Sequence, residues 1–137
     1  YMIPPGSKIT AIADVDKPGV RIAVTARTAY GLWLERNIKN ATMVWCETID
    51  ASYDRFAADK LDVLAGLKPR LLTDVKRMPG ARILDGQFSA VQQALGTSRR
   101  NGEAAKFLEA FIAEVKATGY VSSLIEKHNA VGLSVAP

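Results

Sequence analysis

The residues best suited to bind a ligand are Arg27, Thr28 and Ala29, in a polar turn between an apolar segment and an amphipathic helix. The apolar segment, Ile22–Val24, has the composition of a short buried strand. A helix that begins near Ala29 presents free backbone N–H groups and the positive end of a dipole, so its N-terminus attracts anions. We expect Thr28 and the N–H of Ala29 to hold an anionic group, with Arg27 adding charge. The alternative is structural: Thr28 only caps the helix, and Arg27 is a solvated surface charge.

Two further loops follow predicted strands and offer candidate ligand contacts. Thr42–Cys46 and Leu61–Ala65 are apolar enough for strands, and Thr48 and Lys68 come shortly after them. Ligands of parallel sheets bind outside the carboxyl ends of the strands, where such loops meet. We therefore expect Thr48 to contribute a hydroxyl and Lys68 a positive charge. The alternatives are a helix cap for Thr48 and a solvated charge for Lys68.

Strands and helices alternate along the chain, which predicts an α/β fold with a mostly parallel sheet between two layers of helices. The predicted strands are Tyr1–Ile3, Ile22–Val24, Thr42–Cys46, Leu61–Ala65, Ala81–Leu84 and Ser89–Leu95. Tyr30, Leu34 and Ile38 form the apolar stripe of the first helix, and Tyr53, Phe56 and Ala57 the inner face of the second. Pro69 begins a third helix that runs to Val75, Asn101 caps the longest one, and Gly119 separates that helix from the last.

Composition excludes several classes of function. The 137 residues suit a single globular domain, and the net charge of +4 comes from basic residues scattered along the chain. Because no basic helix face carries interleaved aromatic residues, nucleic-acid binding is not expected. One cysteine, Cys46, and one histidine, His128, are too few for a transition-metal site. We expect neither a metal nor a cofactor, and the N-terminus shows no signal peptide.

The order of these segments resembles bacterial extracellular solute-binding proteins of family 3, the periplasmic receptors of ABC importers for polar amino acids. The matching segments are ADVDKPGVRIAV, the polar turn with Thr28, ASYDRFAADKLDVLAG, and QQALGT with the two helices that follow it. The resemblance implies one lobe of a type II periplasmic-binding-protein fold, a periplasmic location and a membrane permease as partner. It divides the chain into a hinge strand at 1–5, a ligand-binding lobe at 6–88, and a second hinge strand with closing helices at 89–137.

Two departures from the family pattern bear on the ligand. The family's Gly-Thr at the helix start is Arg27-Thr28 here, and its acidic residue for the ligand's amino group falls on Leu67, next to Lys68. The resemblance then implies a small ligand that carries a carboxylate or another anionic group. It also implies that most of the first lobe, with its own arginine for the ligand carboxylate, is missing from this sequence.

Two other interpretations stay open. A few relatives of these receptors are dehydratases of cyclohexadienyl acids such as prephenate, and such chemistry needs a general acid in the cleft. Glu47 is the candidate, since besides Asp50 it is the only carboxylate at a predicted strand exit; the alternative is a solvated Glu47. A single lobe would also expose apolar surface, which favours a homodimer or an exchange of the C-terminal helices between copies.

Overall fold

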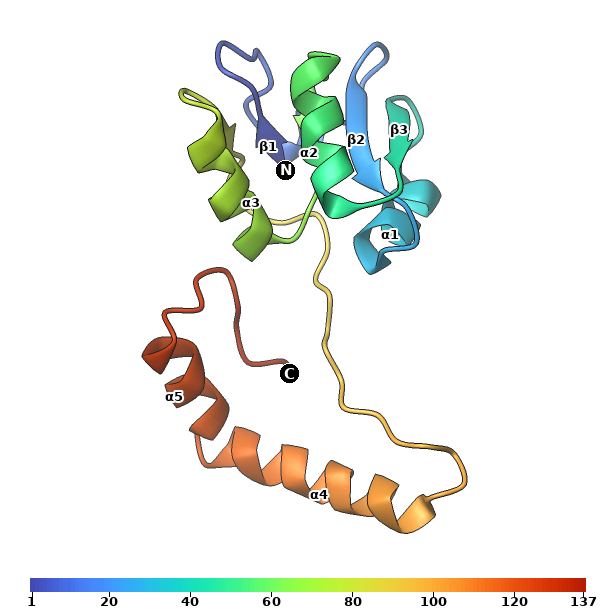
Figure 1. The fold of residues 1–137 in the computed structure, drawn as a ribbon, viewed down its shortest axis with the longest axis vertical. Coiled ribbons are helices and arrows are strands. Elements are labelled where there is room, and N and C mark those ends of the chain that lie inside the picture. The colour runs from blue at the N-terminus through green and yellow to red at the C-terminus, as the bar shows by residue number, and fades with distance from the viewer. The chain divides into compact units, whose positions relative to one another are not determined.

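The computed structural model describes residues 1–137, which form two compact units, Tyr1–Val91 and Gln92–Pro137 (Figure 1). The first unit contains a five-stranded sheet with helices on both faces. The second contains two helices and irregular chain. None of the helices is both long enough and apolar enough to span a membrane.

The sheet of the first unit has the strand order β3-β2-β4-β1-β5. The central strand β2 pairs in parallel with β3 on one side and β4 on the other, whereas β1 is antiparallel to both β4 and β5. Four strands therefore run in one direction, and β1 runs against them between two of them. The strands are β1 (Met2–Ile3), β2 (Arg21–Thr25), β3 (Thr42–Cys46), β4 (Val63–Leu64) and β5 (Arg82–Ile83).

Alternate residues of the strands pack into two separate cores, one on each face of the sheet. Ile22 and Val24 of β2 lie in one core with Leu34 of α1, whereas Ala23 lies in the other core with Phe56 of α2. Side chains alternate between the two faces along a strand, so each face needs its own helix layer. The helices are α1 (Ala29–Asn37), α2 (Ile49–Ala58) and α3 (Lys68–Asp74), with short 3-10 turns η1 (Ile12–Asp14) and η2 (Val75–Arg77). This arrangement confirms the predicted three-layer, mostly parallel α/β fold.

Local sequence signals explain where the helices of this unit begin. Thr28 caps α1 by accepting a hydrogen bond from the N–H of Gly31, and Thr48 caps α2 in the same way through Ala51, each at 3.1 Å. Pro69 lies in the first turn of α3, where its missing N–H costs no helical hydrogen bond. The two threonines therefore take the capping roles that the sequence analysis gives as the alternative to ligand contact.

The loop from α1 to β3 is fixed by one carboxylate. Asp16 accepts hydrogen bonds from the backbone N–H groups of Lys39, Asn40 and Ala41, at 2.7 to 3.1 Å. These bonds hold the pKa of Asp16 below its usual value, because they favour the charged form. The start of β3 is thereby held beside the turn that precedes β2.

The two ends of the first unit lie together. The backbone N–H of Leu84 donates to the carbonyl of Tyr1 at 2.9 Å, and the ring of Tyr1 stacks on Phe88 with centroids 4.3 Å apart. The ring of Trp33 of α1 also packs against Phe88, with the ring centroids 5.4 Å apart. The chain therefore enters and leaves this unit beside β1.

The structure corrects two details of the predicted elements. Ala57 is exposed. Ser52 lies on the inner face of α2, in the place predicted for Ala57, because the Ser52 hydroxyl finds buried partners there. Ser89–Leu95 is irregular chain and not a strand. A strand needs a neighbour for its backbone hydrogen bonds, and no such neighbour pairs with this segment. The roles of 1–5 and 89–95 as hinges stay a prediction.

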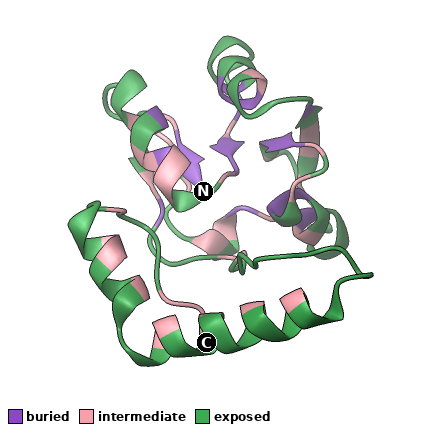
Figure 2. Ribbon diagram, turned by 60° about the horizontal axis from the view of Figure 1, so that its bottom comes forward, coloured by how far each residue is buried: buried purple, intermediate pink, exposed green.

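The second unit consists of α4 (Gly102–Ala117), α5 (Tyr120–Lys127) and the chain around them. Asn101 caps α4 by accepting from the N–H of Ala104 at 3.1 Å, and Gly119 has the left-handed conformation between the helices, as predicted. No residue of this unit is buried, so exposed and half-buried positions cover both helices (Figure 2). Phe107 and Phe111, whose rings stack at 6.1 Å, are both exposed. The apolar stripe of α4 thus forms without a core.

Candidate ligand-binding site

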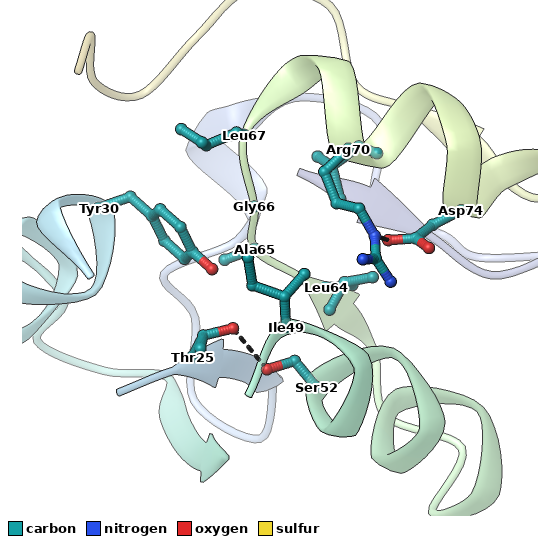
Figure 3. Close-up of a pocket in the computed structure, with 11 residues that line it drawn as sticks. Thr25, Tyr30, Ile49, Ser52, Leu64, Ala65, Gly66, Leu67, Arg70 and Asp74 are labelled. Atoms are coloured by element: carbon teal, nitrogen blue, oxygen red, sulfur yellow. Dashed lines mark hydrogen bonds and ion pairs between the residues drawn. The ribbon is translucent and has the colours of Figure 1, made fainter. Parts of the chain in front are cut away.

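A small pocket lies where the parallel strands of the first unit end (Figure 3). It is formed by the last residues of β2 and β4, the segment after β4, the first turns of α1 and α2, and one side of α3. The volume is about 20 Å³, close to the space that one water molecule needs. The lining residues are Thr25, Tyr30, Ile49, Ser52, Leu64, Ala65, Gly66, Leu67, Arg70, Leu71 and Asp74.

A buried pair of hydroxyl groups forms one wall of the pocket. The oxygens of Thr25 and Ser52 are 2.7 Å apart, and the Ser52 hydroxyl also lies 3.0 Å from the carbonyl of Thr48. Because Ser52 has a single hydroxyl hydrogen and gives it to that carbonyl, Thr25 is the donor to Ser52. Both side chains are satisfied within the protein, so they tie β2 to α2 and shape the pocket wall.

Tyr30, in the first turn of α1, differs from that pair. Tyr30 is only 5% exposed, and its hydroxyl makes no hydrogen bond to another residue; since no buried side-chain oxygen of the protein lacks a partner, this hydroxyl is the part of Tyr30 that is open to solvent. Figure 3 shows the hydroxyl pointing into the pocket. A tyrosine hydroxyl can both donate and accept a hydrogen bond, so Tyr30 offers both to whatever enters the pocket.

Arg70, in the first turn of α3, brings positive charge to the pocket. Its Nε donates to Asp74 at 2.8 Å and its Nη2 donates to Asp50 of α2 at 2.6 Å. These charged partners raise the pKa of Arg70, chiefly through the bond to Asp74, and the bond from Arg70 lowers the pKa of Asp50. Arg70 and Asp50 are therefore both charged at neutral pH.

A second arginine holds the buried carboxylate of this cluster. Asp74 is 1% exposed, and its other oxygen accepts from Nη1 of Arg77 at 3.3 Å. The guanidinium of Arg77 lies 3.7 Å from the ring centroid of Tyr53, and it also pairs with Asp54 at 3.5 Å. Asp74 is thus fixed between two arginines, and the cluster binds α3 to α2.

The structure brings only one of the predicted site residues, Leu67, into this pocket. Arg27 is exposed in the turn before α1, with the positive φ of 58° that a glycine would adopt without strain. Ala29 and Lys68 are exposed first residues of α1 and α3. Thr48 reaches the pocket only indirectly, since its carbonyl holds Ser52.

Thr28 lies in a crowded corner between β2 and α1. Its hydroxyl donates to the carbonyl of Thr25 at 2.8 Å while it accepts from Gly31, so an anion would compete with that carbonyl for the hydroxyl hydrogen. A Cβ on Gly31 would meet the Thr25 carbonyl and the Thr28 hydroxyl at 2.8 Å each. This contact explains a glycine inside a helix. The backbone N–H of Ala29 has no acceptor and stays available for an anion.

Three pocket residues, Tyr30, Ser52 and Arg70, were not expected from the sequence. Tyr30 was assigned to the apolar stripe of its helix, which explains its burial and leaves out its hydroxyl. Arg70 could have been found, because it follows Pro69 at the start of the helix after β4, at the edge where ligands bind.

Two further candidates lie outside the pocket. Glu47 is exposed in the loop between β3 and α2 and does not line it. Cys46, at the end of β3, is buried and free. No group of three or more His, Cys, Asp or Glu side chains is placed to hold a metal ion.

Comparison with solved structures identifies the architecture. The chain is similar to the crystal structure of an ancestral cyclohexadienyl dehydratase, with a TM-score of 0.57 and 19% sequence identity. The fold is that of one lobe of a type II periplasmic binding protein. The similarity covers 92% of this chain and 54% of that chain, so the present chain spans about half the length of the matched protein. No protein-family model and no curated protein match the sequence.

Proposed function

We propose that this chain is the ligand-binding lobe of a solute-binding protein that captures a small solute bearing a carboxylate. The observation that carries the proposal is the position of the pocket: Tyr30 and Arg70 both line it at the carboxyl edge of the sheet, where ligands of parallel α/β folds bind. The similarity to a type II periplasmic-binding-protein lobe supports it. The proposed ligands include amino-acid-like solutes whose carboxylate contacts the pocket.

In this proposal the protein works in the periplasm and delivers its solute to the membrane permease of an ABC importer. The type II periplasmic-binding-protein fold supports this role, together with the resemblance of the sequence to receptors of that class. The remaining contacts to the solute would come from a second lobe, as the length of the matched structure suggests.

A thermal-melting screen tests the proposal. The fluorescence of Trp33 and Trp45, both in the first unit, follows unfolding in the presence of pooled amino acids, dicarboxylates, aromatic acids, phosphorylated compounds and, as a control, neutral sugars. Ligand at about 100 times its dissociation constant adds roughly 2.7 kcal/mol to the free energy of unfolding. For a unit of this size the melting temperature would rise by roughly 11–22 °C.

Two matched variants test whether the solute binds in this pocket. Leu67 and Leu32 are both partly exposed leucines, but only Leu67 lines the pocket. Leu67→Glu places a negative charge at the pocket and should abolish the shift caused by a carboxylate, whereas Leu32→Glu should leave it intact. Equal loss in both variants, or a shift with sugars alone, would contradict the proposal.

The second candidate function is dehydration of a cyclohexadienyl acid, which the name of the matched structure favours. Here the pocket offers no free carboxylic acid, because Asp74, the acidic residue that lines it, pairs with Arg70 and Arg77. Glu47 would have to supply the proton from outside the pocket. Turnover of prephenate that is lost in Glu47→Gln would establish this activity.

A further inference from the structure

The two carboxylates that hold Arg70 differ sharply in burial. The Asp74 side chain is 1% exposed, whereas that of Asp50 is 77% exposed. Asp74 is also held by Arg77, while Asp50 accepts a side-chain hydrogen bond from Arg70 alone. Exposed ion pairs contribute little free energy because water and salt compete for both partners. Asp74 therefore positions the guanidinium, and Asp50 is the partner that can be exchanged.

The guanidinium of Arg70 has hydrogen-bond donors on the side away from Asp74 that can bind another acceptor. Nε is occupied by Asp74, Nη2 donates to Asp50, and Nη1 makes no hydrogen bond. When Asp50 leaves, Nη1 and Nη2 form a free fork, which is the geometry that binds a carboxylate through two parallel hydrogen bonds.

Tyr30 supplies a second polar group at the same pocket. Its hydroxyl is open to solvent, makes no hydrogen bond within the protein, and points into the pocket that Arg70 also lines (Figure 3). The pocket volume of about 20 Å³ holds a group about the size of one water molecule, such as one carboxylate oxygen, and excludes a whole solute. Ile49 and Leu67, both partly exposed, line the same pocket and offer apolar contact to the rest of the solute.

We propose that the carboxylate of the solute replaces Asp50 on Arg70 and accepts a hydrogen bond from Tyr30, so that Asp50 is an internal competitor that weakens binding. This inference rests on the proposed function and names its ligand class: a carboxylate attached to an apolar or aromatic body. One carboxylate is exchanged for another, so the net charge around Arg70 does not change and the displaced Asp50 returns to water.

Matched charge variants test the exchange. The probes are acetate and 3-phenylpropionate, each compared with its neutral amide by titration at pH 7. Asp50→Asn and Asp54→Asn remove the same charge from the same helix, but Asp54 pairs with Arg77 and not with Arg70. Asp50→Asn should bind 3-phenylpropionate about two- to five-fold more tightly than the unchanged protein, the range that an exposed ion pair accounts for. Asp54→Asn should leave the affinity unchanged.

Two further variants test the contacts themselves. Tyr30→Phe removes a hydroxyl that makes no internal hydrogen bond, so the melting temperature should stay constant while binding weakens about tenfold. Arg70→Lys keeps the charge and loses the fork, and it should weaken binding by at least about tenfold. Trp33 and Trp45 fluorescence confirms that both variants are folded.

The outcomes separate this inference from the proposed function. Equal tightening in Asp50→Asn and Asp54→Asn, or unchanged binding in Tyr30→Phe, overturns the exchange even if a solute binds. Binding of a neutral solute in the melting screen, with no binding of either carboxylate, overturns the inference and leaves a solute-binding function. No binding of any pool or probe, in Asp50→Asn as well, overturns both.

Discussion

The helices α2 and α4 have similar sequence patterns and opposite surroundings. Both are amphipathic, and both begin at a side-chain cap that accepts a hydrogen bond at 3.1 Å. Phe56 of α2 is 1% exposed in the core of the first unit, whereas Phe107 of α4 is 67% exposed. The periodicity of a sequence therefore shows that a helix has an apolar face, and only tertiary structure shows whether that face is covered. In the first unit the sheet covers it; in the second nothing within the unit does.

The largest difference in the free energy of unfolding is expected when these two phenylalanines are each replaced by alanine. Phe56→Ala leaves a cavity between α2 and the sheet and should lower the free energy of unfolding by about 3–5 kcal/mol. Phe107→Ala removes an exposed side chain and should change it by less than about 0.5 kcal/mol. Urea denaturation followed by tryptophan fluorescence and by circular dichroism measures both values.

A large loss of stability in Phe107→Ala would contradict the expected difference between α2 and α4, because it would show that α4 packs on a partner in solution. Sedimentation at two protein concentrations then identifies that partner. If the unchanged protein dimerises and Phe107→Ala does not, a second copy covers the apolar face of α4.

A smaller effect is expected for one carboxylate in each unit. Asp74 is buried between two arginines, and Asp74→Asn should cost about 1.5–3 kcal/mol, the range for hydrogen bonds to charged groups. Glu103 pairs with Lys106 at 3.0 Å, with both side chains exposed to solvent. Glu103→Gln should cost no more than about 0.5 kcal/mol. The same urea titrations measure the two variants, and equal losses would show that burial of Asp74 is not what makes its contacts strong.

The smallest effect concerns the two helix caps. Thr48→Ala should lower the free energy of unfolding by about 1 kcal/mol, since the cap stabilises a helix that folds with the core. Asn101→Ala should leave the transition seen by tryptophan fluorescence unchanged and should speed hydrogen exchange at the Ala104 amide. If Asn101→Ala shifts the tryptophan transition, the two units unfold together and the contrast between them is lost.

The parts of the fold that were predicted correctly depend on local signals. Thr28, Thr48 and Asn101 each precede an apolar stripe with helical spacing, and all three cap the helices expected of them. The strand β3 matches its prediction residue for residue, since Thr42–Cys46 is an apolar run of strand length. These features are set by neighbours in the sequence.

The errors come from contacts between distant residues. Ser52 faces inward because its hydroxyl meets Thr25, 27 positions earlier, and hydrophobicity alone would choose Ala57. Ser89–Leu95 has the composition of a strand, but it forms none without a neighbouring strand.

The candidate site was harder to predict for the same reason. The pair of Arg70 with Asp74 is visible in the sequence as an i,i+4 spacing, whereas its contact with Asp50 spans 20 positions. The burial of Tyr30 follows from its helix stripe, but the direction of its hydroxyl depends on the strands around it. The sequence thus indicates the edge of the sheet where the pocket lies, and only the fold shows which side chains meet there.

The stacking of Tyr1 on Phe88 has a topological consequence. A unit whose two ends meet at one point can be inserted into a loop of another domain without stretching either partner, and it can be circularly permuted by joining those ends. Its fold then does not depend on which strand comes first in the chain. For the first unit, β1 could follow β5 through a short loop, and the new termini could open at the exposed turn before β2 with the same sheet retained.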